Sequence, residues 1–116
     1  MDRTPTPRQT GDDMTDEPLA LVVEFRAAPG RVDDLRAALL ELTAATRTED
    51  GCLRYDLHED VADPDVLVFY EVWASPAAHA AHDATAHVTS FVARIPQLTV
   101  EPPRMTRLRR IEPQEA

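Results

Sequence analysis

The pattern of apolar residues predicts a strand and then a helix after residue 18. Residues 19–26 alternate with a period of two, and their apolar members share one face of a predicted strand: Leu19, Leu21, Val23 and Phe25. After a break at Pro29-Gly30, apolar residues recur at helical spacing through about Arg47: Val32, Leu35, Leu39 and Leu42. The first part of the chain therefore has the pattern of a β-α unit.

Two further strands are expected after a turn at residues 49–51. In residues 52–59 the alternation places Leu53, Tyr55 and Leu57 on one face and Arg54, Asp56 and His58 on the other. Residues 60–65, which include Pro64, are expected to form a hairpin loop. Residues 66–74 are apolar on both faces, which indicates a strand that is covered on both faces. Only Glu71 interrupts this pattern, on the face of Phe69 and Trp73.

The last third of the chain predicts a second helical segment and two short strands. Ser75-Pro76 is a typical helix start, because serine caps a helix and proline suits its first position. We expect the helix over residues 76–83 to kink near Thr85-Ala86, to resume, and to end at Pro96. Residues 98–101 and 105–111 are the predicted final strands.

The predicted order is β-α-β-β-α-β, the ferredoxin-like arrangement of an α+β domain. We assign residues 18–111 to this domain, residues 1–17 to a disordered leader and residues 112–116 to a disordered tail. Two helices can cover only one face of a four-stranded sheet. The other face carries apolar residues from 66–74 and from Ala20 and Val22, more than a monomer usually exposes. We therefore expect a homodimer that packs sheet against sheet.

Composition and charge exclude several classes of partner. The net charge of -9 argues against binding to nucleic acid or to an anionic membrane surface. No run of 18 apolar residues could span a membrane, and the polar N-terminus has no signal-peptide core, so we expect a cytoplasmic protein. The single cysteine, Cys52, excludes an internal disulfide and is expected to be a small buried hydrophobic residue.

Three segments between about residues 19 and 98 resemble the antibiotic biosynthesis monooxygenase family. Asp50–His58 resembles the family's Gly-Cys-x-x-Tyr-x-x-His segment, and Phe69–Trp73 resembles its FYEVW strand. The helical segment that begins at Ser75-Pro76 resembles the family's in three residues: His82, His87 and Phe91. The resemblance implies a dimeric α+β barrel with a pocket between sheet and helices. For many members it also implies cofactor-free oxygenation of quinols, anthrones or related polyphenols by O₂.

The family includes other activities, and one departure of this chain bears on them. Haem-degrading relatives use an asparagine on the first strand, and some anthrone oxygenases carry one near the tryptophan, but this sequence contains no asparagine. The departure counts against haem chemistry and also against a polyketide substrate. The alternatives to an oxygenase are a ligand-binding or stress-related dimer of the same fold and a small-molecule isomerase.

Candidate site residues follow from the needs of a cofactor-free oxygenation. The reaction needs a base that titrates near neutral pH, which favours histidine, and we expect His82 to take a phenolic proton. Glu71 is expected to lie next to the His82 ring and to fix its tautomer, and Trp73 is expected to stack on the substrate ring. The structural alternatives are a surface histidine, a solvated carboxylate and a core tryptophan. The predicted substrate-binding residues are Phe69, His87, Tyr55 and Phe91.

No metal site and no cofactor are expected. His79 and His82 are three residues apart on a predicted helix and could share a metal ion, but the sequence offers them no obvious third ligand. His58 lies on the polar face of its predicted strand, where a solvated position or a dimer interface is expected.

Overall fold

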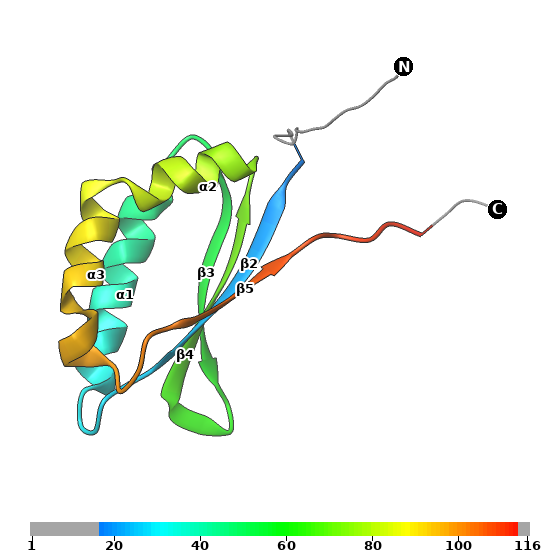
Figure 1. Ribbon diagram of the computed structural model, residues 1–116. Coiled ribbons are helices and arrows are strands. Elements are labelled where there is room, and N and C mark those ends of the chain that lie inside the picture. Colours follow the sequence, from blue (N-terminus) through cyan, green and yellow to red (C-terminus); the bar gives the residue numbers. More distant parts are fainter. Residues whose placement is uncertain (1–16, 114–116) are drawn as a thin grey trace, which may run out of the picture.

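A four-stranded antiparallel sheet carries all the helices on one of its faces in the computed structural model, which describes residues 17–113 (Figure 1). The elements along the chain are β2 (Leu19–Arg26), α1 (Val32–Thr46), β3 (Cys52–Asp60), β4 (Asp63–Trp73), α2 (Pro76–Asp83), α3 (Ala86–Leu98) and β5 (Arg104–Leu108). The strand order is β3-β4-β2-β5. The ferredoxin-like α+β prediction is confirmed. The predicted leader, apart from residue 17, and the last three residues of the predicted tail lie outside the described residues.

The two central strands provide most of the buried face under the helices. In the antiparallel pair of β2 and β4, Val23 lies opposite Phe69 and Leu21 opposite Glu71. Both pairs are buried, as is Trp73 at the end of β4. Within residues 17–113, no layer covers the other face of β4, and Tyr70 there is 36% exposed. The two-sided apolar pattern of this strand therefore corresponds to one covered face and one open face.

Aromatic rings from strands and helices hold the core together on the covered face. The ring of Phe25 meets those of Phe69 and Phe91 edge-on, at centroid distances of 6.0 and 5.8 Å. Such edge-to-face pairs add to the free energy gained from burial alone. The apolar face of α1 closes the layer with Leu35, Leu39 and Leu42, as its helical spacing predicted.

The start of β3 departs from the predicted alternation. The pairing with β4 shifts between Cys52, opposite Trp73, and Arg54, opposite Val72. The extra residue in this bulge is Leu53, which is 57% exposed, whereas Cys52 is half-buried and packs against the core. The prediction that Leu53 shares the face of Tyr55 is therefore wrong, because a bulge moves one residue out of alternation.

The hairpin between β3 and β4 is tighter than predicted. Asp60 pairs with Asp63, so the loop consists of residues 61–62 and not of residues 60–65. The Asp60 carboxylate accepts a hydrogen bond from the Ala62 N–H at 2.8 Å, a contact that stabilises a short turn. Pro64 is tolerated in β4 because the pairing with β2 ends at Val66, so its missing N–H costs no bond on that side.

The predicted kinked helix is two separate helices. The side chain of Ser75 caps α2 by accepting from the Ala78 N–H, and Thr85 caps α3 in the same way. Pro96 does not end α3, which continues to Leu98. The predicted strand at residues 98–101 is reduced to a single bridge between Thr99 and Ala27.

The last strand is shorter than predicted, since β5 ends at Leu108. All five of its residues are exposed, and the chain beyond it runs away from the body of the domain (Figure 1). In the part of the chain that the structure describes, no helix has the length and apolar character needed to cross a membrane.

Gly51 allows the turn before β3 to lie against α2, and this contact generates a testable prediction. A Cβ atom at Gly51 would lie 2.3 Å from the Cβ of Ala78, which is far inside van der Waals contact. We expect Gly51→Ala to lower the free energy of unfolding by about 1–3 kcal/mol, the usual cost of overpacking. Chemical denaturation of the purified variant measures this change.

The matched control for this prediction is the double variant Gly51→Ala/Ala78→Gly. Removing the Ala78 Cβ abolishes the clash but costs about 1 kcal/mol in helix propensity, so the double variant is compared with Ala78→Gly alone. Adding Gly51→Ala to Ala78→Gly should change the free energy of unfolding much less than it does in the wild type. An equal loss in both backgrounds would contradict the proposed clash.

Candidate functional site

A pocket of about 250 Å³ lies between the covered face of the sheet and the helices α2 and α3. Its aromatic lining includes Tyr55, Phe69 and Phe91, three of the predicted substrate-binding residues. Its polar groups come from Glu71, His79, His82 and Asp83. A pocket with an apolar wall and a few convergent polar groups is the usual form of a small-molecule site.

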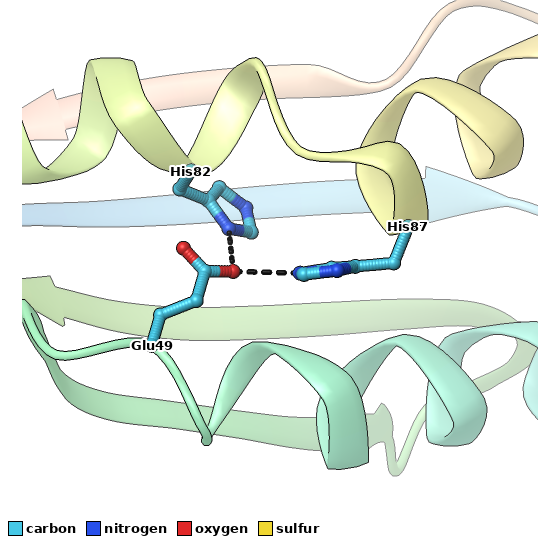
Figure 2. Close-up of side chains that lie close together, drawn as sticks. All are labelled: Glu49, His82 and His87. Carbon is cyan, nitrogen blue, oxygen red and sulfur yellow. Dashed lines mark hydrogen bonds and ion pairs between the residues drawn. The ribbon is translucent and has the colours of Figure 1, made fainter.

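His82 reaches this pocket from the last turn of α2, and a carboxylate fixes its ring. His82 is 4% exposed, and its Nδ1 lies 2.9 Å from the Oε2 of Glu49 (Figure 2). Because the carboxylate is an acceptor, Nδ1 carries the proton in this pair, which leaves Nε2 of a neutral ring as an acceptor. A histidine held in this tautomer can accept a proton through Nε2.

Glu49 lies in the turn after α1, and local hydrogen bonds hold this turn in place. The Glu49 N–H donates to the Thr46 carbonyl at 3.0 Å, and the Cys52 N–H donates to the Glu49 carbonyl at 3.1 Å. The side chain of Glu49 then points towards α2 and α3 (Figure 2). The turn therefore delivers a carboxylate to histidines that are 33 and 38 residues further along the chain.

His87 approaches the same carboxylate oxygen from the first turn of α3. Its Nε2 lies 2.7 Å from Oε2 of Glu49, so one oxygen atom joins two imidazole rings (Figure 2). His87 does not line the pocket under the helices. It lines a second groove of about 250 Å³ between α1 and α3, together with Glu41 and Arg94. His87, predicted as a substrate-binding residue, is therefore placed by the structure in a neighbouring groove.

Glu71 is a buried carboxyl group whose hydrogen-bond partner is Trp73 and not the predicted His82. It is 4% exposed and accepts a hydrogen bond from the Trp73 Nε1–H at 3.0 Å. Burial raises the pKa of Glu71 to about 7, although the hydrogen bond from Trp73 opposes this shift. The expectation that Glu71 stands behind His82 is wrong in this respect, because Glu49 is the carboxylate bonded to His82.

Trp73 lies behind the site and does not form its wall. The side chain is fully buried, and its ring packs on that of His82 with the centroids 4.5 Å apart and the planes tilted by 38°. It is absent from the pocket lining. The alternative of a core tryptophan therefore describes Trp73 better than stacking on a substrate does. Its ring packs on His82, and its N–H holds the carboxyl group of Glu71.

The other titratable groups near the pocket differ in what they can do. Burial lowers the pKa of His79, and the neighbouring Asp83 carboxylate, 3.8 Å from His79 Nε2, opposes that shift. Burial raises the pKa of Tyr55 above its usual range, so its hydroxyl group remains protonated. His58 lies on the open face of the sheet, opposite Val68, and is remote from this pocket.

Comparisons with known proteins converge on one family. A family model described as antibiotic biosynthesis monooxygenase matches residues 18–94. Two curated relatives bear the name "putative monooxygenase". Rv0793 of Mycobacterium tuberculosis is 35% identical over 77% of this chain and 87% of its own length. YcnE of Bacillus subtilis is 30% identical over 72% of this chain and 88% of its own length.

Solved structures agree with the fold. The crystal structure of PA3566 from Pseudomonas aeruginosa is 34% identical, covers 83% of this chain and 96% of its own, and has a TM-score of 0.79. The structure of Rv0793 also has a TM-score of 0.79, with 32% identity over 85% of this chain and all of its own.

The buried carboxyl of Glu71 generates a prediction about stability and pH. Above pH 4.5 the unfolded carboxyl has lost its proton, whereas the folded one keeps it up to about pH 7. Unfolding therefore releases a proton in this window, and stability falls as the pH rises through it. Glu71→Gln keeps the shape of the protonated acid, so its stability relative to wild type should rise from pH 4.5 to about 7 by up to ~3 kcal/mol and then level off.

Urea denaturation of both proteins across this pH range measures the difference. The matched change is Glu24→Gln, because Glu24 is exposed at the far side of β2. Two results would contradict the assignment to Glu71. One is the same pH dependence of the free energy of unfolding in Glu24→Gln. The other is a stability difference between wild type and Glu71→Gln that does not change with pH.

Proposed function

The chain belongs to the antibiotic biosynthesis monooxygenase family, and we propose that it oxidises a small, single-ring quinol with O₂ and without a cofactor. The family and the names of the relatives support a monooxygenase-type function. The observation that supports the finer assignment is His82, whose Nδ1 is held by Glu49 while its ring lines an aromatic pocket.

The size of the pocket favours one ring over several. Its volume of about 250 Å³ lies below the ~300–1,000 Å³ that is usual for drug-sized ligands. A fused tricyclic anthrone would need displacement of the lining side chains, whereas a single ring could lie against Phe69 and Phe91. Tyr55 keeps its proton and could donate a hydrogen bond to a phenolic oxygen.

The proposed chemistry begins with removal of one phenolic proton by His82 Nε2. Glu49 accepts the hydrogen bond from Nδ1 throughout this step and holds the ring in place. Glu71 lines the same pocket as a carboxyl group that can hold or release a proton near neutral pH.

The oxygenation balances without any other reductant. The quinol anion transfers one electron to O₂, and the two radicals combine to form a C–O bond at the ring. The peroxide takes back the proton from His82. Its O–O bond then breaks as the oxygenated ring carbon loses its hydrogen as a proton, so that a C=O bond forms and the leaving hydroxide and this proton depart as water. One oxygen atom stays on the ring, the other leaves in water, and the ring is oxidised from a quinol to a hydroxyquinone.

We propose that the working unit is a homodimer formed through the open face of the sheet. This face presents a shallow hollow whose apolar lining includes Ala20, Leu53, Tyr70, Val72 and Leu108. Leu53 and Tyr70 are 57% and 36% exposed, although both are large and apolar. A second copy packed on this face would remove them from water, which is the usual fate of a patch of this kind.

The role of His82 is tested by its replacement. His82→Ala should lower kcat for quinol oxidation by about 10²–10⁴-fold, the usual contribution of a general base, with little change in KM. Oxygen consumption with a panel of single-ring quinols measures it. Gln97→Ala is the control, since Gln97 is exposed on α3, away from the pocket and from the open face of the sheet.

Two outcomes would contradict this assignment. Turnover by His82→Ala at the wild-type rate would place the base elsewhere. Tight binding of a quinol by the wild type without any oxygen uptake would favour the ligand-binding alternative. Circular dichroism of each variant must show that the fold is intact, because His82 is buried.

The dimer is tested by a charge in the middle of the open face. Val72→Asp places a carboxylate where the proposed interface would bury it unpaired, which costs several kcal/mol. We expect the dissociation constant of the dimer to rise at least ~100-fold. Light scattering across micromolar concentrations measures the mass. Val61→Asp, at the exposed tip of the hairpin, should leave the dimer intact, and a monomeric wild type would exclude the proposal.

A further inference from the structure

We propose that Glu49, His82 and His87 form a binding site for one divalent transition-metal ion, such as Zn²⁺ or Co²⁺. Each residue offers one ligand atom, and the three atoms lie within 4.8 Å of one another. The expectation of no metal site considered His79 with His82 and missed Glu49, which belongs to a distant turn. The site does not depend on the proposed oxygenation.

The distances suit coordination after small movements of the side chains. The two imidazole nitrogens lie 2.9 and 2.7 Å from the same carboxylate oxygen. An ion bound at about 2.0–2.2 Å by each atom would hold neighbouring ligand atoms roughly 3–3.5 Å apart. Rotation of the Glu49 carboxylate and loss of the shared protons would open this space, because each nitrogen that now donates would become a ligand.

The residue types select the class of ion. Two imidazoles and one carboxylate suit zinc, iron, cobalt, nickel or copper, whereas magnesium and calcium prefer sites made of oxygen atoms alone. Three protein ligands also leave room for water or another molecule to complete the coordination. The site therefore resembles an open metal centre more than a closed structural one.

The surroundings hold the ligands in place and leave a path to solvent. His82 is buried, and its ring packs on the fully buried Trp73. The side chains of Glu49 and His87 are 15% and 28% exposed, and His87 lines the groove between α1 and α3. An ion could enter through this groove without passing through the pocket between the sheet and the helices α2 and α3.

Occupation of this site would have two consequences. An ion would add a direct link between three segments, namely the turn after α1, the end of α2 and the start of α3. It would also take the lone pair of His82 Nδ1, so the proton of a neutral ring would move to Nε2. Nε2 could then no longer accept a proton, and metal binding would oppose the base role of His82.

The experiment is a titration of the full-length, tag-free and chelator-treated protein with Co²⁺. We expect visible absorption bands that saturate at one ion per chain, and isothermal titration calorimetry with Zn²⁺ should give the same stoichiometry. Because the ion binds only the folded chain, Tm should rise by about 10 °C or more at 100-fold excess over the dissociation constant.

Variants identify the ligands. Glu49→Gln and His87→Ala alter side chains that are not fully buried. Each should weaken Zn²⁺ binding by more than ~10-fold, since replacing even a residue that only hydrogen-bonds to a metal ligand costs that much affinity. His58→Ala should bind like the wild type. His79→Ala should also retain binding, because His79 pairs with Asp83 and not with Glu49.

Three results would overturn the proposal. The first is the absence of Co²⁺ and Zn²⁺ binding by the wild type. The second is unchanged binding by Glu49→Gln and His87→Ala, which would place the ion elsewhere. The third is loss of binding in His79→Ala but not in His87→Ala, which would assign the ion to the pair His79 and His82. Loss of quinol oxidation alone would bear on the proposed function and not on this site.

Discussion

Burial of one face of β4 is the constraint on which the rest of the structure depends. Phe69, Glu71 and Trp73 alternate onto this face, and all three are almost completely buried. Two aromatic side chains require a layer of helices above them, and this layer needs the sharp start that Ser75 gives to α2. Burial of the carboxyl group between them raises its pKa to about 7, and this group accepts a hydrogen bond from the indole N–H of Trp73.

A second junction, at Glu49, determines where the histidines lie. The helical layer is broken after Asp83, and α2 and α3 therefore present His82 and His87 from two directions. One carboxylate oxygen of Glu49 accepts hydrogen bonds from both rings. It thereby links a residue of the pocket between sheet and helices, His82, to a residue of the groove between α1 and α3, His87. The two proposed uses of this cluster, proton transfer and metal binding, would exclude each other, because both depend on His82 Nδ1.

The sequence predicted the fold well because its period and its helix caps are local signals. Leu19–Arg26 and Pro76–Asp83 have the predicted bounds. The errors came from features without a local signature. The bulge at Leu53 depends on pairing with β4, and Pro96 is accommodated in the last turn of α3.

The candidate site was only partly predictable for the same reason. Tyr55, Phe69 and Phe91 were identified from their faces and from the family resemblance, and they line the pocket. Glu49 was interpreted as a turn residue, which it is, but its side chain pairs with a histidine 33 residues away. A contact of that separation is a product of tertiary packing, and a single sequence does not encode it in any spacing.

The alternation of β4 also separates the two proposed surfaces of the molecule. Odd-numbered residues from Phe69 to Trp73 face the helices, whereas Tyr70 and Val72 face the open side of the sheet. A shift of one residue in pairing would exchange the two sets, so the register must be strongly specified. The bulge at Leu53 is compatible with both faces of the sheet. It adds an apolar side chain to the open face, while Cys52 and Tyr55 remain packed in the core. Pocket and dimer surface can therefore vary independently on one strand, as long as its register is kept.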